Sequence, residues 1–172
     1  MKTPGLWIRE QGFTFCGVLF LAMMGTAAGG QGIDLGGASA AHKGHVVLVS
    51  DAVQVMAGEP QVVELRFRVD EGFHINSHAP KDELLIPTVL RLDSGGAVKV
   101  VGAEYAKGSA FRLGGASGEV LDVYQGEFRV SLRVVAPKGA STLTGTLHYQ
   151  ACDNSSCFPP RTLPVMVAVT GE

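Results

Sequence analysis

Hydrophobic and polar residues alternate along much of the chain that follows residue 45. The clearest run is VELRFRV at 63–69, in which apolar residues take turns with charged ones. A similar alternation of apolar and polar residues recurs at 128–134 and 142–149, and apolar residues at every second position of 163–169 form a last inward row. A strand places successive side chains on opposite faces, so each segment predicts a half-buried β-strand with one face toward a core.

Shorter apolar runs predict three further strands, at 45–56, 86–92 and 97–103. Turn sequences such as GEP, DEG, SGG and PKG separate the strands, and no segment beyond the N-terminus keeps the period of a helix. Seven or eight short strands in about 125 residues predict an all-β protein, an immunoglobulin-like β-sandwich of antiparallel strands. A small β-barrel is the alternative arrangement.

The N-terminus has the pattern of an export signal. Lys2 and Arg9 precede the uncharged run FTFCGVLFLAMM at 13–24, and the small residues GTAAGG follow it. A membrane-spanning helix needs about 20 apolar residues, so the run favours a cleaved signal peptide over residues 1–28 rather than an uncleaved anchor helix. We expect Cys16 to leave with this peptide.

The composition bounds the rest of the chain. Residues 29–44 are rich in Gly, Ala and Ser and predict a flexible leader, so the folded domain spans 45–172. Hydrophobic residues make up 46% of the chain and charged ones 17%, which favours a globular protein over a disordered one. The net charge of −2 shows no excess of positive charge of the kind that favours binding to nucleic acid. Export predicts a periplasmic or other oxidising location, where neighbouring cysteines are usually bonded.

The segment YQACDNSSCFPP holds Cys152 and Cys157, the only cysteines outside the predicted signal. It joins the predicted strands 142–151 and 161–170 closely enough to form an antiparallel hairpin. Alternation along the first strand points Tyr149 into the core and Cys152 to the surface, within reach of another protein's thiol.

The cysteine pair is compatible with a structural staple and with thiol–disulfide exchange, and the spacing leaves both open. Closing a loop of about six residues stabilises a fold by about 2 kcal/mol, against about 4.7 kcal/mol for a loop of about 100 residues, so the bond is a weak staple. A zinc site is disfavoured because two thiolates need two further ligands, and only His148 is close in sequence.

A different class of function is a non-catalytic β-sandwich that binds copper or a protein and carries a structural disulfide; a purely structural, adhesion-type sandwich is a third. His42, His45, His74 and His78 could supply imidazole ligands to copper. His74 and His78 lie four residues apart, but outside a helix this spacing does not place them on one face. The sequence therefore predicts no metal site and no cofactor.

Three segments together resemble a known family. YQACDNSSCFPP is similar to the active-site segment of the amino-terminal periplasmic domain of the thiol:disulfide interchange protein DsbD, whose pattern is Tyr-Gln-x-Cys followed by Cys-x-Pro-Pro. EGFHINSHAPKDELLIPTVLRL at 71–92 and VLDVYQGEFRV at 120–130 resemble two further stretches of that domain. The resemblance covers about residues 45–170. It includes neither the multi-span membrane domain nor the C-terminal thioredoxin-like domain of the full-length protein, so we expect a stand-alone version.

The resemblance implies an immunoglobulin-like fold with Cys152 and Cys157 as a redox-active pair and with protein-disulfide reductase activity. It implies that the domain receives electrons from a membrane-embedded transporter or a thioredoxin-like donor. The expected acceptors are exported thiol–disulfide oxidoreductases, such as disulfide isomerases and thioredoxin-like proteins. A cap loop with acidic and aromatic residues often shields the pair in this family. The corresponding segment here, AEYAKGSAFRLGGASGE at 103–119, does not match that cap residue by residue.

Five residues are candidates for supporting roles. The resemblance places His74, Asn76 and His78 near the cysteines if the 71–80 loop packs beside the hairpin. A histidine there could move a proton during exchange, whereas the alternative is that these residues hold the loop backbone. Tyr149 is expected in the core, and Phe158 either covers one side of the disulfide or packs against the prolines.

Overall fold

The computed structural model describes residues 44–114 and 118–172 of the 172-residue chain. The predicted signal peptide and the predicted leader, apart from Gly44, lie outside these residues, as do Cys16 and His42. In the part of the chain that the structure describes, there is no helix long and apolar enough to cross a membrane.

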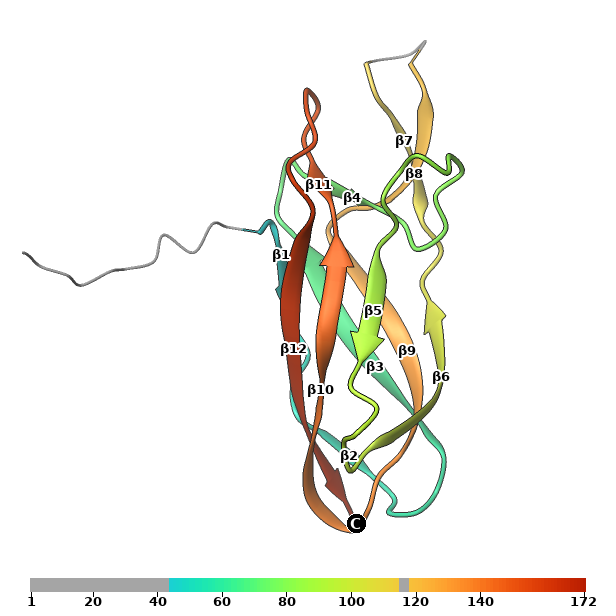
Figure 1. Ribbon diagram of the computed structural model, residues 1–172, viewed down its shortest axis with the longest axis vertical. Coiled ribbons are helices and arrows are strands. Elements are labelled where there is room, and N and C mark those ends of the chain that lie inside the picture. Colours follow the sequence, from blue (N-terminus) through green and yellow to red (C-terminus); the bar gives the residue numbers. More distant parts are fainter. Residues whose placement is uncertain (1–43, 115–117) are drawn as a thin grey trace, which may run out of the picture. The chain divides into compact units, whose positions relative to one another are not determined.

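Two four-stranded sheets pack face to face and form a β-sandwich (Figure 1). The first sheet has, in spatial order, the strands β1 (Val46–Leu48), β3 (Gln61–Val69), β9 (Glu127–Val135) and β6 (Lys99–Tyr105). The second has β2 (Val53–Val55), β12 (Arg161–Gly171), β10 (Gly139–Tyr149) and β5 (Val89–Leu92).

A third sheet of four short strands lies at one end of the sandwich (Figure 1). Its strands, in spatial order, are β11 (Ala151–Cys152), β4 (His74–Asn76), β8 (Val120–Tyr124) and β7 (Ser109–Arg112). The sheet was not expected as a separate unit, because none of its strands exceeds five residues and such runs are too short for a clear alternation.

The core forms where the alternating apolar rows of the two large sheets meet. Leu65 and Phe67 of β3, Val130 and Leu132 of β9 and Leu147 of β10 are fully buried. They belong to one cluster with residues of β12, so the predicted inward rows are confirmed. The predicted all-β, immunoglobulin-like sandwich of mainly antiparallel strands is therefore the observed fold.

The described residues contain more strands than the sequence predicted. The expected strand at 45–56 divides into β1 and β2, which join different sheets. The segment 120–130 also divides, because Gly126 has a φ of 58° and turns the chain between β8 and β9. Strand pairing is antiparallel except between β2 and β12, which run parallel.

The predicted cysteine hairpin is confirmed. Strands β10 and β12 pair antiparallel from Gly139 opposite Gly171 to Tyr149 opposite Arg161. After Tyr149 the chain leaves the second sheet, and β11 pairs with β4 instead. This change of partner places the cysteine turn at the edge of the third sheet.

Candidate redox site

The two cysteines form a disulfide across a tight turn. The Sγ atoms of Cys152 and Cys157 are 2.02 Å apart, and their Cα atoms 3.9 Å. The Asp153 carboxylate closes the turn by accepting hydrogen bonds from the backbone N–H groups of Ser155 and Ser156, both at 2.7 Å. The Asp153 N–H donates to the Ser156 carbonyl at 2.9 Å. The turn is therefore held by its own hydrogen bonds as well as by the disulfide.

The chain leaving the turn is tied back to the chain entering it. The Phe158 N–H donates to the Ala151 carbonyl at 2.8 Å, and Nε2 of Gln150 donates to the Phe158 carbonyl at 3.0 Å. Pro159 and Pro160, which cannot donate backbone hydrogen bonds, then lead into β12. These contacts hold the backbone on either side of Cys157 without using its sulfur.

The prediction that Cys152 lies at the surface is wrong. Cys152 is only 2% exposed, whereas Cys157 is exposed. The alternation itself held, since Ala151 belongs to the sandwich core and Cys152 does not. The error came from equating the side away from the core with solvent, because other residues cover that side.

The cover over Cys152 comes from the face of the third sheet that points away from the sandwich core. His74 lies directly opposite Cys152 in the ladder between β4 and β11, so the two side chains share a face. The ring of Phe111 in β7 lies tilted against the His74 ring, with ring centroids 4.2 Å apart and an angle of 32° between the planes. Leu121 and Val123 of β8 are buried but lie outside the main core cluster. These residues form a second, smaller apolar group on the face of the third sheet that carries Cys152.

Phe111 is the functional candidate that the sequence did not reveal. It lies in the segment 103–119, where no cap could be matched, and the structure pairs its strand with β8 to form the outer edge of the third sheet. The only available signal was that Phe111 is the sole phenylalanine in a Gly- and Ala-rich stretch. An aromatic ring therefore does lie beside the site, contributed by a strand rather than by an irregular loop.

His74 combines burial with an unused hydrogen-bonding atom. His74 is 1% exposed. Among the described residues, its Nε2 is the one buried side-chain nitrogen or oxygen atom without a hydrogen-bond partner. Burial lowers the pKa of His74 below its ordinary value of 6.5, and the negative charge of Asp153 opposes this shift. The pKa of Asp153 is itself lowered, chiefly by the N–H groups of Ser155 and Ser156 and less by His74.

The other predicted supporting residues have structural contacts. Asn76 is buried, donates from Nδ2 to the Ile86 carbonyl at 3.0 Å and accepts from the Thr88 hydroxyl at its own carbonyl at 2.6 Å. It therefore fixes the loop between β4 and β5. His78 is exposed and stacks on Tyr105 with centroids 3.6 Å apart, and no contact joins it to the cysteines.

The aromatic residues that flank the cysteines in sequence are also placed. Tyr149 is buried as expected, and its hydroxyl donates to the Gly44 carbonyl at 2.6 Å. Phe158 is half-buried and lies against Phe73 and His45, with centroids 5.9 and 5.5 Å apart. This second aromatic group borders the exit of the cysteine turn.

The histidines do not gather into a metal site in the described part of the chain. His45 stacks on Phe73, His78 stacks on Tyr105, and His74 lies tilted against Phe111. Within residues 44–114 and 118–172, there is no group of three or more His, Cys, Asp or Glu side chains that could hold a metal ion. The copper-binding alternative therefore receives no support from these residues.

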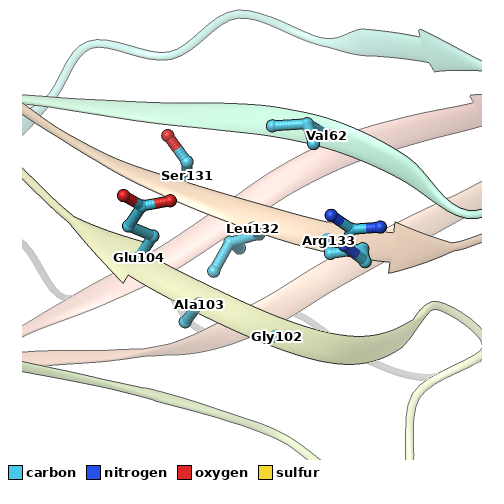
Figure 2. Close-up of a pocket in the computed structure, with 7 residues that line it drawn as sticks. All are labelled: Val62, Gly102, Ala103, Glu104, Ser131, Leu132 and Arg133. Atoms are coloured by element: carbon cyan, nitrogen blue, oxygen red, sulfur yellow. The ribbon is translucent and has the colours of Figure 1, made fainter.

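A surface hollow elsewhere on the domain is separate from the disulfide. Figure 2 shows this hollow over β3, β9 and β6 of the first sheet. It is lined by Val62, Gly102, Ala103, Glu104, Ser131, Leu132 and Arg133. Neither cysteine nor His74 borders it.

Comparison with known proteins gives a family match and two similar folds. The model of the family "Thiol:disulfide interchange protein DsbD, N-terminal" matches residues 44–168. The chain is similar to the reduced N-terminal domain of DsbD from Neisseria meningitidis, with 21% identity and a TM-score of 0.43 over 67% of this chain and 83% of that one. It is also similar to PapD-like domain 7 of human CEP192, with 13% identity and a TM-score of 0.34 over 75% and 86% of the two chains. We found no match among the curated proteins.

Proposed function

Because the chain belongs to the family of the N-terminal domain of the thiol:disulfide interchange protein DsbD, we propose that it is an exported domain that relays electrons through the Cys152–Cys157 pair. In this proposal the domain works in the periplasm. It receives electrons from a membrane electron transporter or a thioredoxin-like donor. It passes them to periplasmic thiol–disulfide oxidoreductases, including disulfide isomerases, as a protein-disulfide reductase.

The observation that carries the proposal is the unequal exposure of the two cysteines. An exposed Cys157 can be reached by a partner's sulfur, while Cys152 is buried against the third sheet. Thiol–disulfide exchange passes through a mixed disulfide, which needs one accessible sulfur and one held back to resolve it. A staple has no need of such an asymmetry.

Cys157 is therefore assigned the mixed disulfide and Cys152 the resolving step. When the domain is reduced, the donor thiolate attacks Cys157, and Cys152 leaves as the thiolate. The second donor thiol then attacks the donor sulfur of the mixed disulfide and releases Cys157. Two electrons enter the pair, and two protons complete the two thiols.

A redox titration tests whether the pair is a relay. The oxidised domain is equilibrated with thioredoxin and with glutathione buffers, and the reduced fraction is measured by thiol alkylation and mass spectrometry. We expect a potential between those of thioredoxin and the disulfide isomerases, roughly −270 to −180 mV. A potential below about −300 mV would mark an inert structural bond and reject the relay.

Trapping tests the assignment of the two sulfurs. The Cys152→Ser variant keeps the exposed thiol and should accumulate a mixed disulfide with a thioredoxin-like protein that retains only its attacked cysteine. That protein is supplied as its mixed disulfide with thionitrobenzoate, which leaves as the thiolate. The Cys157→Ser variant, purified in parallel, should not. Equal trapping by both variants, or trapping only through Cys152, would contradict the assigned order.

A further inference from the structure

His74 is placed in a way that the sandwich itself does not require. A buried polar atom without a hydrogen-bond partner costs about 1–3 kcal/mol, so such atoms are rare and call for an explanation. Nε2 of His74 is such an atom, in a residue that is 1% exposed. The residue stands on the face that carries the buried half of the disulfide, opposite Cys152.

The surroundings of His74 contain few polar groups. Across β11 its neighbour is Cys152, and on the β7 side it meets the ring of Phe111. On the intervening strand, Leu121 and Val123 are apolar. In the oxidised state the sulfur opposite His74 carries no hydrogen, so it has no proton to donate to Nε2.

We propose that Nε2 of His74 is the proton acceptor for the Cys152 thiol, both as the partner of an S–H···N hydrogen bond in the reduced protein and as the base when the disulfide re-forms. This inference rests on the proposed relay function and adds the residue that moves its proton. The atom that lacks a partner in the oxidised structure then gains one on reduction.

The oxidative half of the relay begins at the exposed sulfur. The Cys157 thiolate attacks one sulfur of a disulfide-bonded acceptor. A bond forms between Cys157 and that sulfur as the acceptor's own disulfide breaks. The acceptor's other sulfur leaves as a thiolate with the electron pair.

The second step uses His74. The Cys152 thiol gives its proton to Nε2 of His74, and the resulting thiolate attacks Cys157. The Cys152–Cys157 bond forms as the bond between Cys157 and the acceptor breaks. The acceptor sulfur that was bonded to Cys157 leaves as a thiolate. The His74 imidazolium then returns the proton to that thiolate or to water. The pair has lost two electrons, and the acceptor disulfide has gained them.

The charges around His74 fit this task. Asp153, in the turn after β11, is the charged group that acts on the imidazole, and it favours the protonated form that the step creates. On β7, Arg112 follows Phe111 in the chain, and on β8, Asp122 binds the Ser77 hydroxyl at 2.7 Å. Burial keeps the imidazole neutral near pH 7 and therefore able to accept a proton.

Other groups near the pair are less suited to this role. The Asp153 carboxylate accepts two backbone hydrogen bonds in the turn, and these lower its pKa further. A carboxylate so stabilised is a weak base for a thiol. His45 and His148 are engaged elsewhere, with Asp70 and with Thr146 and Thr162 respectively.

A small disulfide reagent separates the two steps in the full domain. The reduced protein is mixed in a stopped-flow instrument with dithiodipyridine, whose thiopyridone product is coloured. Attack by Cys157 releases the first thiopyridone at a rate proportional to reagent concentration. Attack by Cys152 releases the second at a rate independent of that concentration. The two phases are followed from about pH 5 to pH 9, a range that brackets the titration of imidazole and thiol.

The His74→Gln variant should change only the second phase. We expect that phase to slow by about 100-fold at pH 7, the low end of what a general base contributes. The rate of the second phase increases with pH, and in the variant this increase should shift from the pH range in which imidazole titrates to the range in which a thiol titrates, above about pH 8.5. The first phase should stay within two-fold (about 0.4 kcal/mol) of the parent. An unchanged second phase, or one slowed equally at every pH, would overturn the proposal.

The matched control is His78→Gln, a histidine that also stacks on an aromatic ring but has no contact with the cysteines. Both of its phases should match those of the parent. If His74→Gln does not fold, the parent protein still decides the question. Titration of nitrogen-labelled histidine by NMR should give a different His74 pKa in the oxidised and reduced forms, and an identical pKa would reject the S–H···N bond.

The proposed function and this inference fail in different ways. If both thiopyridones are released at rates that do not depend on His74, the relay proposal stands and the role proposed for His74 is rejected. A pair with a potential below about −300 mV rejects the relay, although His74 could still speed the reagent reaction.

Discussion

The burial difference between the two cysteines predicts unequal costs for removing them. Both Cys152→Ala and Cys157→Ala break the disulfide, which closes a loop with a sequence separation of 5. In the chain-entropy description, a loop of about six residues is worth about 2 kcal/mol. This bond-breaking cost is shared by the two variants and by the reduced parent.

Only the first variant also loses a buried group. Cys152 is 2% exposed, and a buried cysteine behaves as a small hydrophobic side chain. Removing its sulfur leaves a space about the size of a methylene group, with a further cost of about 1 kcal/mol. Removing the sulfur of the exposed Cys157 leaves no such space and adds no such cost. We therefore expect losses of about 3 kcal/mol for Cys152→Ala and about 2 kcal/mol for Cys157→Ala.

Differential scanning calorimetry of the folded domain measures both the bond-breaking cost and the cost of losing the buried sulfur. For a domain of about 130 residues, 2 kcal/mol corresponds to about 7 °C in Tm and the additional 1 kcal/mol to about 3–4 °C. The reduced parent should have the same Tm as the Cys157→Ala variant. Equal melting of the two variants, or a lower Tm for Cys157→Ala, would refute the assigned burial. A reduced parent unfolded at 25 °C would refute the view that the bond is a weak staple.

Two further predictions concern the surroundings of the pair, and a third concerns the second sheet of the sandwich. Phe111→Ala should make the oxidised protein react several-fold faster with dithiothreitol, in a stopped-flow assay, because it uncovers Cys152; the stability loss should stay below the 3–5 kcal/mol of a fully buried phenylalanine. Burial lowers the pKa of His74, so near this pH the unfolded chain binds more protons than the folded protein. The free energy of unfolding, measured by urea melts, should therefore fall as the pH drops below about 6.5 and become constant below the folded-state pKa. The His74→Gln variant should show a weaker dependence on pH. Gly145→Ala should lower the Tm by pushing β5 from β10, because the new Cβ would collide with the Arg91 carbonyl, at a cost of about 1–3 kcal/mol.

The large sheets could be predicted from the sequence because their strands are long enough to show their period. Strands β3, β9, β10 and β12 have at least nine residues each, and their inward rows are buried as expected. The third sheet could not be predicted in the same way. A strand such as β4 has three residues, all buried, so it shows no alternation at all.

The same limit explains the error at Cys152. Alternation correctly gave the side of the strand on which the side chain lies, but not what covers that side. His74 lies opposite Cys152 on that side, and the Phe111 ring that lies against His74 comes from about 40 residues earlier in the chain. The place of Phe111 depends on the pairing of β7 with β8 and of β8 with β4. Local pattern carries no information about pairing between such distant short strands, so burial of the sulfur had to come from the structure.

The third sheet holds the cysteine turn through contacts that do not use the disulfide. The turn is closed by Asp153, and its exit is tied to Ala151 by a backbone hydrogen bond. The ladder between β11 and β4 holds Cys152 opposite His74 without using the sulfur. Because these contacts do not involve the disulfide, we expect that breaking the bond costs about 2 kcal/mol of chain entropy and leaves the backbone of the turn in place. Reduced thiols held close together in this way could re-form the bond, which the proposed relay needs and a staple does not.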